Sequence, residues 1–252
     1  MTSLWLAEKY LEHYRDDPQW RIKSFVSTVK RDYLLDISYN QAWRARMKAL
    51  IMTRGFAPEQ YAKVWDYAAT VLKWNQGSSA YVKPETMTIG SPERPLRFQR
   101  FYVCLKACKE GFKKGCRPII GLDGCHLKGV YTGQVLTAVG KDGNENIFPI
   151  AYAVVESETK ETWCWFLEIL IQDIGSQALT FMSDRQKGLI EALSLVAPMA
   201  DTRVCVRHMH NNFKVQWPGK GFKDAVWAAA KASTTPQFEV AMKVIKDMDE
   251  NA

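Results

Sequence analysis

The sequence predicts an α/β protein in which a mixed five-stranded sheet follows a mainly helical N-terminal region. Apolar residues recur at helical spacing through most of residues 3–73, whereas short apolar runs of strand length begin after residue 117. The second half of the chain alternates such runs with amphipathic stretches, as is typical of α/β domains. We therefore expect the sheet in the second half of the chain.

The N-terminal region, residues 1–95, is expected to contain helices separated by short breaks. Ser38 is placed to cap a helix that is closed by Gly55. Short strands are expected at 81–82 and 87–89, before a turn-rich joint that contains Gly and Pro.

After residue 117 the elements are expected in the order β-β-β-α-β-α-β-α. The five strands are expected at 118–123, 134–140, 147–155, 178–184 and 203–206. The helices are expected at 159–174, 187–196, 209–216, 219–232 and 236–249. The first three strands form an antiparallel meander, and the later strands join in parallel through right-handed helical crossovers. This order describes the RNase H-like fold, expected here over residues 117–217.

The composition predicts a packed, soluble and intracellular protein. Of the 252 residues 47% are hydrophobic and 12% are aromatic, and no apolar run approaches the roughly 18 residues that cross a bilayer. No membrane partner is therefore expected. Charged residues also occur too early for a secretory signal, and the six cysteines lack the spacing of a disulfide scaffold. Reduced thiols fit this pattern best.

A basic segment from Arg94 to Lys128 carries nine Lys or Arg and two acidic residues, in a chain of net charge +7. Its linker part, residues 96–116, is expected to form a helix from Arg97 to Lys109. Aromatic residues are interleaved with the bases: Phe98, Phe101, Tyr102 and Phe112. This pattern is typical of a polyanion-binding surface, and an amphipathic helix with a solvated basic face explains it equally well.

Asp123 and Asp184 each end an apolar, strand-like run. In the predicted sheet these two strands are neighbours, so the carboxylates should meet outside the carboxyl end of the sheet. Adjacent carboxylates repel unless a cation neutralises them, and hard oxygen ligands suit Mg²⁺ or Mn²⁺. Such ions can activate water for phosphodiester attack. The alternative is that each Asp caps a turn or a helix, since Asp184 stands just before a predicted helix.

Five motifs stand in order along the second half: RPIIGLDGCHLKG (117–129), IFPIAYAVVE (147–156), WCWFL (163–167), SDRQKGL (183–189) and CVRH (205–208). Together they resemble the plant Mutator-like element (MULE) transposases of the MuDR type. The similarity runs from about Trp5 to Asn251, because the helical N-terminal part also resembles the region before this domain in plant members.

The resemblance implies DNA transposition in the nucleus: hydrolytic cleavage at transposon ends, then transfer of the freed 3′ hydroxyl to target DNA. It implies that Asp123 and Asp184 are the first two catalytic acids and ligands of Mg²⁺ or Mn²⁺. Cys205 and His208 match the family's Cys-x-x-His signature. Residues 218–252 then correspond to the start of a helical insertion.

Cys205 and His208 could also be half of a zinc site, but no second pair has finger-like spacing, so no zinc is expected. We expect Cys205 to be buried on the fifth strand and His208 to lie near the acids. Trp163 is expected to pack on the sheet. Cationic residues that flank the acids are expected to contact DNA phosphates, with surface salt bridges as the alternative: Lys128, Arg185, Lys187 and Arg207.

The family's third acid, a Glu, is expected far beyond the second and after the helical insertion. Glu239 and Glu250 occupy amphipathic or fraying helix positions, whereas Glu156 and Glu161 flank the wrong strand or open a helix. We therefore expect a C-terminally truncated member that lacks the third acid and is inactive alone. The alternatives are a non-catalytic DNA-binding regulatory protein and a decayed fragment, and the sequence leaves the oligomeric state open.

Overall fold

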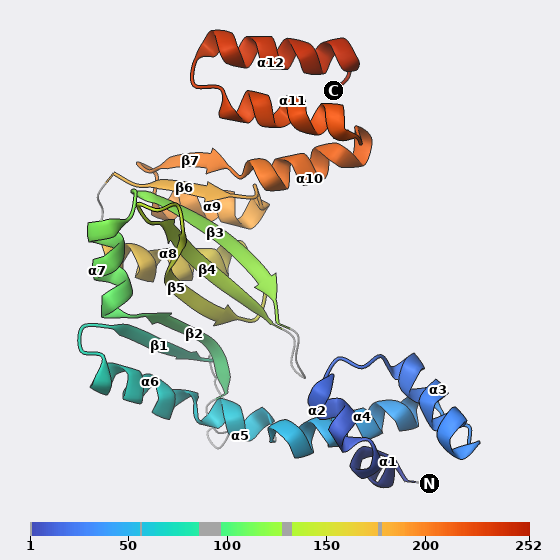
Figure 1. The fold of residues 1–252 in the computed structure, drawn as a ribbon. Coiled ribbons are helices and arrows are strands. Elements are labelled where there is room, and N and C mark those ends of the chain that lie inside the picture. The colour runs from blue at the N-terminus through green and yellow to red at the C-terminus, as the bar shows by residue number, and fades with distance from the viewer. Residues whose placement is uncertain (1, 56, 86–96, 128–132, 176–177) are drawn as a thin grey trace. The chain divides into compact units, whose positions relative to one another are not determined.

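The computed structural model describes residues 2–55, 57–85, 97–127, 133–175 and 178–252. Within them the chain is a mixed α/β protein with a seven-stranded sheet (Figure 1). It divides into two compact units, one built mainly from residues 1–71 and the other mainly from residues 100–127 and 133–252. None of the described helices is long and apolar enough to cross a bilayer.

The N-terminal region is helical, as predicted. Its helices are α1 (Ser3–Lys9), α2 (Leu11–Asp16), α3 (Ile22–Tyr33), α4 (Tyr39–Arg54), α5 (Ala57–Ala62) and α6 (Val64–Trp74). Ser38 caps α4 by accepting a hydrogen bond from the Gln41 amide at 3.1 Å, and Gly55 ends this helix with φ 81°, so both capping predictions are confirmed. The strand predicted at 87–89 lies outside the described residues.

The sheet has the order β1-β2-β5-β4-β3-β6-β7. Its strands are β1 (Ser79–Pro84), β2 (Phe98–Cys104), β3 (Ile119–His126), β4 (Gln134–Lys141), β5 (Ile147–Val155), β6 (Thr180–Ser183) and β7 (Asp201–Val204). The strands β3, β4 and β5 form an antiparallel meander, whereas β6 and β7 continue from β3 in parallel. The predicted number of five strands is wrong, because β1 and β2 extend the sheet beyond β5.

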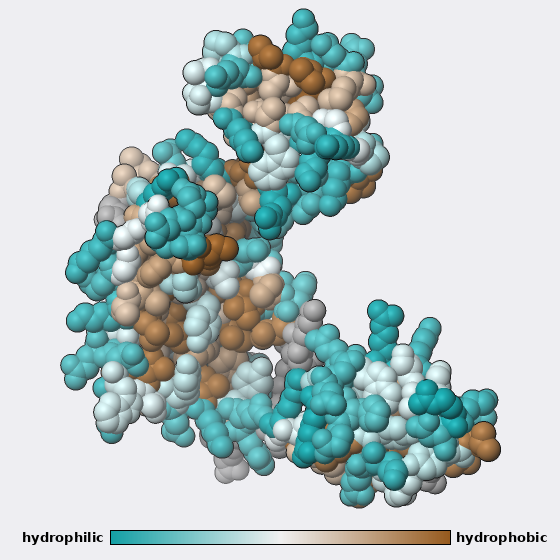
Figure 2. Space-filling model, in the orientation of Figure 1, coloured by the Kyte–Doolittle hydropathy of each residue, from teal (hydrophilic) through white to brown (hydrophobic). Residues whose placement is uncertain are grey.

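Helices α8 (Lys160–Ile174) and α9 (Lys187–Val196) make the crossovers that parallel pairing requires, and Figure 1 shows both behind the sheet. Their apolar faces join the inner residues of β3, β4 and β6 in one buried core. Trp163 of α8 is fully buried there, so the prediction that it packs on the sheet is confirmed. Figure 2 shows apolar residues also on the visible face of the strands, where Figure 1 draws β3, β4 and β5.

Residues Phe98–Cys104 form the strand β2 and not the first part of a basic helix. The strand pairs with β5, with Phe101 opposite Val154, and it is buried without interruption from residue 100 to 104. A strand that is covered on both faces loses its alternation of polar and apolar residues, which is why spacing alone suggested a helix. The helix of this segment is α7 (Lys106–Gly115).

The last helices of the chain are α10 (Val206–Gln216), α11 (Lys220–Lys231) and α12 (Thr235–Met248), close to the ranges predicted. Thr234 caps α12 by accepting from the Gln237 amide at 3.4 Å, and Pro236 lies in the first turn, where a missing N–H costs nothing. Ala225, Val226 and Ile245 form a small core between α11 and α12.

Candidate functional site

The parallel pairing of β3 and β6 places Asp123 and Asp184 at the same level of the sheet. The register pairs Ile119 with Thr180 and continues to Gly121 opposite Met182. Asp123 and Asp184 each lie two residues beyond that last pair, and adjacent strands are about 4.8 Å apart. The prediction that the two strands are neighbours is therefore confirmed.

Asp123 lies inside β3 and does not end it, because the strand continues to His126. Its carboxylate is exposed, and Oδ1 accepts a hydrogen bond from the Gly124 amide at 3.0 Å. The strand extends further than predicted because β4 runs beside it as far as the pair His126–Gln134. An exposed carboxylate in a paired strand has a fixed backbone and a side chain that reaches solvent.

Asp184 directly follows β6 and is half-buried. It does not cap α9, because Gln186 is the capping residue and accepts from the Leu189 amide at 2.6 Å. The Oδ1 atom of Asp184 instead accepts from the Gln186 amide at 3.0 Å, across Arg185, whose φ is 69°. This turn holds the Asp184 side chain at the end of the strand.

Glu158 is a third carboxylate at this place, which the sequence did not single out. Its Cδ and Oε2 atoms lie 2.8 Å from where a Cβ at position 124 would stand, so only glycine leaves this space open next to Asp123. Trp163 donates its Nε1 hydrogen to Glu158 Oε1 at 3.2 Å. Burial raises the pKa of Glu158 against the effect of that hydrogen bond, and the charges of Asp184 and Asp123 raise it further.

The loop that carries Glu158 is also attached to the start of α9. Gln186 donates from Nε2 to the Glu158 carbonyl at 3.3 Å. A Cβ at Gly188 would lie only 2.7 Å from the Lys160 amide nitrogen, so the helix and the loop are in close contact. Asp184 and Glu158 are therefore held by the same junction.

Glu156 and Glu161, two other candidates for the third acid, bind a different partner. Both bind Arg100, at 2.6 Å and 2.8 Å from its Nη2 atom, and the Arg100 side chain is 1% exposed. A buried guanidinium without its carboxylates would be costly, so these two acids serve the stability of the sheet.

Cys205 lies one residue beyond β7, and it is the capping residue of α10 and not part of a strand. Its amide donates to the Ser183 carbonyl at 2.7 Å, which brings it beside the residue that precedes Asp184. It is half-buried, so the prediction of a buried strand position is wrong. His208 lies in the first turn of α10, and its Nδ1 atom is buried and has no hydrogen-bond partner among the described residues.

Three of the four predicted phosphate-contacting residues are exposed near the acids: Arg185, Lys187 and Arg207. Within the described part of the chain none of them forms an ion pair, so the alternative of surface salt bridges is not seen there. Lys128 lies outside the described residues. The available cations therefore surround the start of α9 and the start of α10.

Within its described residues, the basic segment does not place all of its bases on one surface. Arg100 and Lys109 point into the protein, where Lys109 Nζ lies 2.7 Å from Asp173 Oδ1. Tyr102 and Phe112 are buried in the sheet core. The interpretation as an amphipathic helix with a solvated basic face holds for α7, where Lys106, Lys113 and Lys114 are exposed and Phe112 is buried, but not for residues 98–104, which form β2.

Residues 119–212 match the family model described as MULE transposase domain. This match supports the MULE family for that part of the chain. No curated protein matches the sequence. All the predicted site residues lie inside the matched range, whereas the helical N-terminal region lies outside it.

The residues of the matched range offer oxygen donors to a hard cation. Asp123 and Asp184 bring carboxylates to one level, and Gly124 leaves space in which the Glu158 carboxylate stands beside them. Such donors suit Mg²⁺ or Mn²⁺ better than softer metals. Among the described residues no three His, Cys, Asp or Glu side chains are already grouped as ligands of one ion.

Proposed function

We propose that this protein is derived from a MULE transposase and cleaves DNA phosphodiester bonds with a divalent cation held at Asp123 and Asp184. The observation that carries the proposal is the parallel register of β3 and β6, which brings the two acids together within the matched domain. The order of elements from β3 to α10 supports an RNase H-like core for this chemistry.

Each group of the site has a part in the proposed reaction. Asp123 and Asp184 hold the cation, and Arg185, Lys187 and Arg207 bind phosphates of the DNA backbone. A bound Mg²⁺ or Mn²⁺ ion supplies Lewis-acid stabilisation and lowers the pKa of an attacking water. Transfer of the freed 3′ end, recognition of transposon ends and a nuclear location follow from the resemblance alone and belong to the same proposal.

Glu158 supplies the third acidic group in this proposal. The expectation that the third acid is absent rests on acids near the chain end, on Glu156 after β5 and on Glu161 in the first turn of α8; Glu158, in the loop between β5 and α8, is not among them. Glu158 interacts electrostatically with both Asp123 and Asp184. We therefore replace the expectation of an inactive chain with the prediction of metal-dependent nicking.

A second function, DNA binding without cleavage, is favoured by one observation. The described carboxylates are not already arranged as three ligands of one ion. A protein of this kind would bind DNA through its exposed cations and act as a regulator. Retained DNA binding without nicking would support this second function.

The deciding experiment is Mn²⁺-dependent nicking of supercoiled plasmid. Asp123→Asn and Asp184→Asn each remove one negative oxygen and keep the side-chain shape, and Asp224→Asn, an exposed position on α11, is the matched control. We expect nicking by the unaltered chain and by the control, and none by either site variant. Absence of nicking in the unaltered chain, with Mn²⁺ and DNA binding measured separately, would overturn the catalytic proposal.

A further inference from the structure

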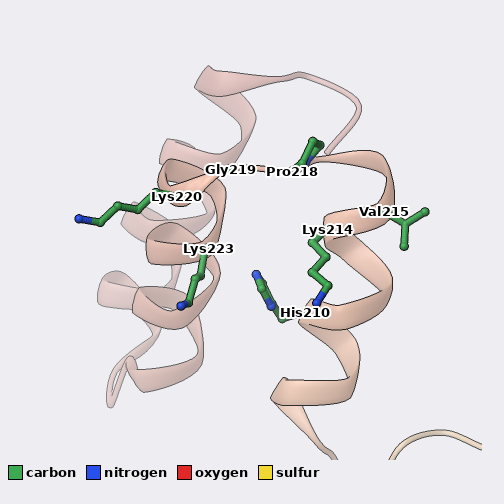
Figure 3. A pocket seen from close by; sticks show the side chains of 7 residues that line it. All are labelled: His210, Lys214, Val215, Pro218, Gly219, Lys220 and Lys223. Atoms are coloured by element: carbon green, nitrogen blue, oxygen red, sulfur yellow. The ribbon is translucent and has the colours of Figure 1, made fainter.

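A basic pocket lies at the corner between α10 and α11, apart from the carboxylates (Figure 3). It has a volume of about 510 Å³. The lining residues are His210, Lys214, Val215, Pro218, Gly219, Lys220 and Lys223. The lining contains three lysines and a histidine and no acidic residue, and the histidine imidazole is its one aromatic ring. A cavity with this lining attracts anions.

The cationic groups come from both helices. Figure 3 shows the His210 imidazole of α10 in the space between the helices, whereas Lys214 and Lys223 run along their own helices and Lys220 extends away. Lys214 Nζ donates to Asn211 Oδ1 at 2.9 Å, a neutral partner that leaves its charge uncompensated. Within the described part of the chain no ion pair occupies Lys214 or Lys223.

Aromatic packing also holds α10 and α11 together at this corner. The Phe213 ring is stacked on Trp217 with centroids 4.9 Å apart, and it meets Phe222 of α11 edge-on at 5.8 Å. Lys214 and Lys223 each directly follow one of these anchored ring residues in the chain, so their backbones are positioned before any ligand binds. Pre-positioned groups lose less conformational freedom on binding.

The turn adds backbone donors to the same place. Gly219 precedes α11 with φ 121°, and no side chain caps this helix. The first N–H groups of a helix have no partner within it and favour anions. Three lysines and a histidine therefore line this pocket, and the open amides at the start of α11 lie at the same turn.

We propose that this pocket binds phosphate groups of the DNA backbone and forms a second DNA contact, distinct from the carboxylate site. Lysine is a point charge that contacts phosphate oxygens without reading bases, and the lining has no large aromatic ring on which a base could stack. The contact is therefore independent of DNA sequence. The proposal takes from the proposed function only that DNA is the partner.

The test measures DNA binding by fluorescence anisotropy in EDTA, as a function of salt, with a labelled duplex. Lys214→Gln/Lys223→Gln removes two charges from the pocket, and Lys231→Gln/Lys243→Gln removes two exposed charges of α11 and α12 as the matched control. The slope of log K against log salt is negative, and each lost phosphate contact makes it less steep by about 0.9. We expect the slope of the pocket variant to be less steep by about 2 and the slope of the control to be unchanged.

Equal slopes in the pocket variant and the unaltered chain would overturn the proposal, and so would an equal decrease in the control. A second arm follows the His210 imidazole by NMR with inorganic phosphate and with the duplex at matched ionic strength. Saturation by inorganic phosphate at lower concentration than by DNA phosphates would assign the pocket to a free phosphate ligand and overturn the DNA contact.

This test separates the two proposals. EDTA removes the metal, so the salt slope does not depend on cleavage. Asp123→Asn/Asp184→Asn is expected to keep the pocket contribution to the slope, whereas Lys214→Gln/Lys223→Gln is expected to keep Mn²⁺ binding. Loss of nicking alone would therefore leave the pocket proposal intact, and an unchanged slope would leave the carboxylate site intact.

Discussion

Replacing Gly124 by alanine should displace the Glu158 carboxylate without removing any acidic group. The new Cβ would lie 2.8 Å from Cδ and from Oε2 of Glu158. Carbon contacts are optimal at about 3.5–4.0 Å, so the carboxyl group must move by about 1 Å. Because that group is the end of a flexible side chain, the protein should fold with a loss of less than about 1 kcal/mol.

The displacement should weaken metal binding. Moving Glu158 lengthens its 3.2 Å hydrogen bond from Trp163 Nε1 and shifts its charge relative to Asp123. Altering an acidic group that supports a metal site costs about 10- to 100-fold in affinity, and we expect a loss near the lower limit. Glu158→Gln should lose at least as much, and the double variant should lose little more than Glu158→Gln alone, because both changes act on one group.

The assay is a Mn²⁺ titration followed by the electron paramagnetic resonance signal of free Mn²⁺. Gly143→Ala, where a Cβ would have nothing within 4 Å, is the control for the glycine change. Urea unfolding of each variant shows whether the fold is retained. Unchanged Mn²⁺ affinity in both Gly124→Ala and Glu158→Gln, together with lost binding in Asp123→Asn, would refute the role of Glu158.

Further predictions concern the framework of the sheet. Asp173→Asn should lower the free energy of unfolding, measured in urea, by about 3 kcal/mol. Lys109 Nζ and Tyr102 Oη bind this carboxylate at 2.7 Å and 2.9 Å, and the substitution would leave the lysine unpaired. A loss below about 0.5 kcal/mol, as for a surface change, would contradict this network. Gly188→Ala should cost about 1–3 kcal/mol in the same assay, since its Cβ would meet backbone 2.7 Å away; stability equal to that of Gly143→Ala would contradict the contact. Burial raises the pKa of Cys104 to about 12. At pH 8 iodoacetamide should therefore alkylate the exposed Cys125 and spare Cys104. Early modification of Cys104, measured by mass spectrometry of tryptic peptides, would contradict this prediction.

The sequence alone predicted that the strands of Asp123 and Asp184 are neighbours. Each ends or follows an apolar run of strand length, and the order of elements makes the two runs neighbours. Parallel pairing then brings such residues to one level of neighbouring strands, so local pattern and the rule for crossovers were sufficient, although β3 continues past Asp123. The same holds for the helix limits at Ser38 and Gly55, where the capping chemistry is local.

The buried bases of the basic segment could not be identified from the local sequence. Arg100 and Lys109 look like surface charges because the chain shows their positive neighbours and not their partners. Those partners are Glu156, which directly follows β5, and Asp173 of α8, and only folding brings them near. Burial on both faces of β2 likewise removed the alternation that identifies a strand.

Tertiary structure alone decided the place of Glu158. Its loop has no motif that sets it apart from Glu156 or Glu161, and it is far from Asp184 along the chain. Two glycines determine its position: Gly124 leaves room for the carboxylate, and Gly188 lets α9 approach the loop. A glycine shows in the sequence that close approach is allowed, but only the packed structure shows which group approaches.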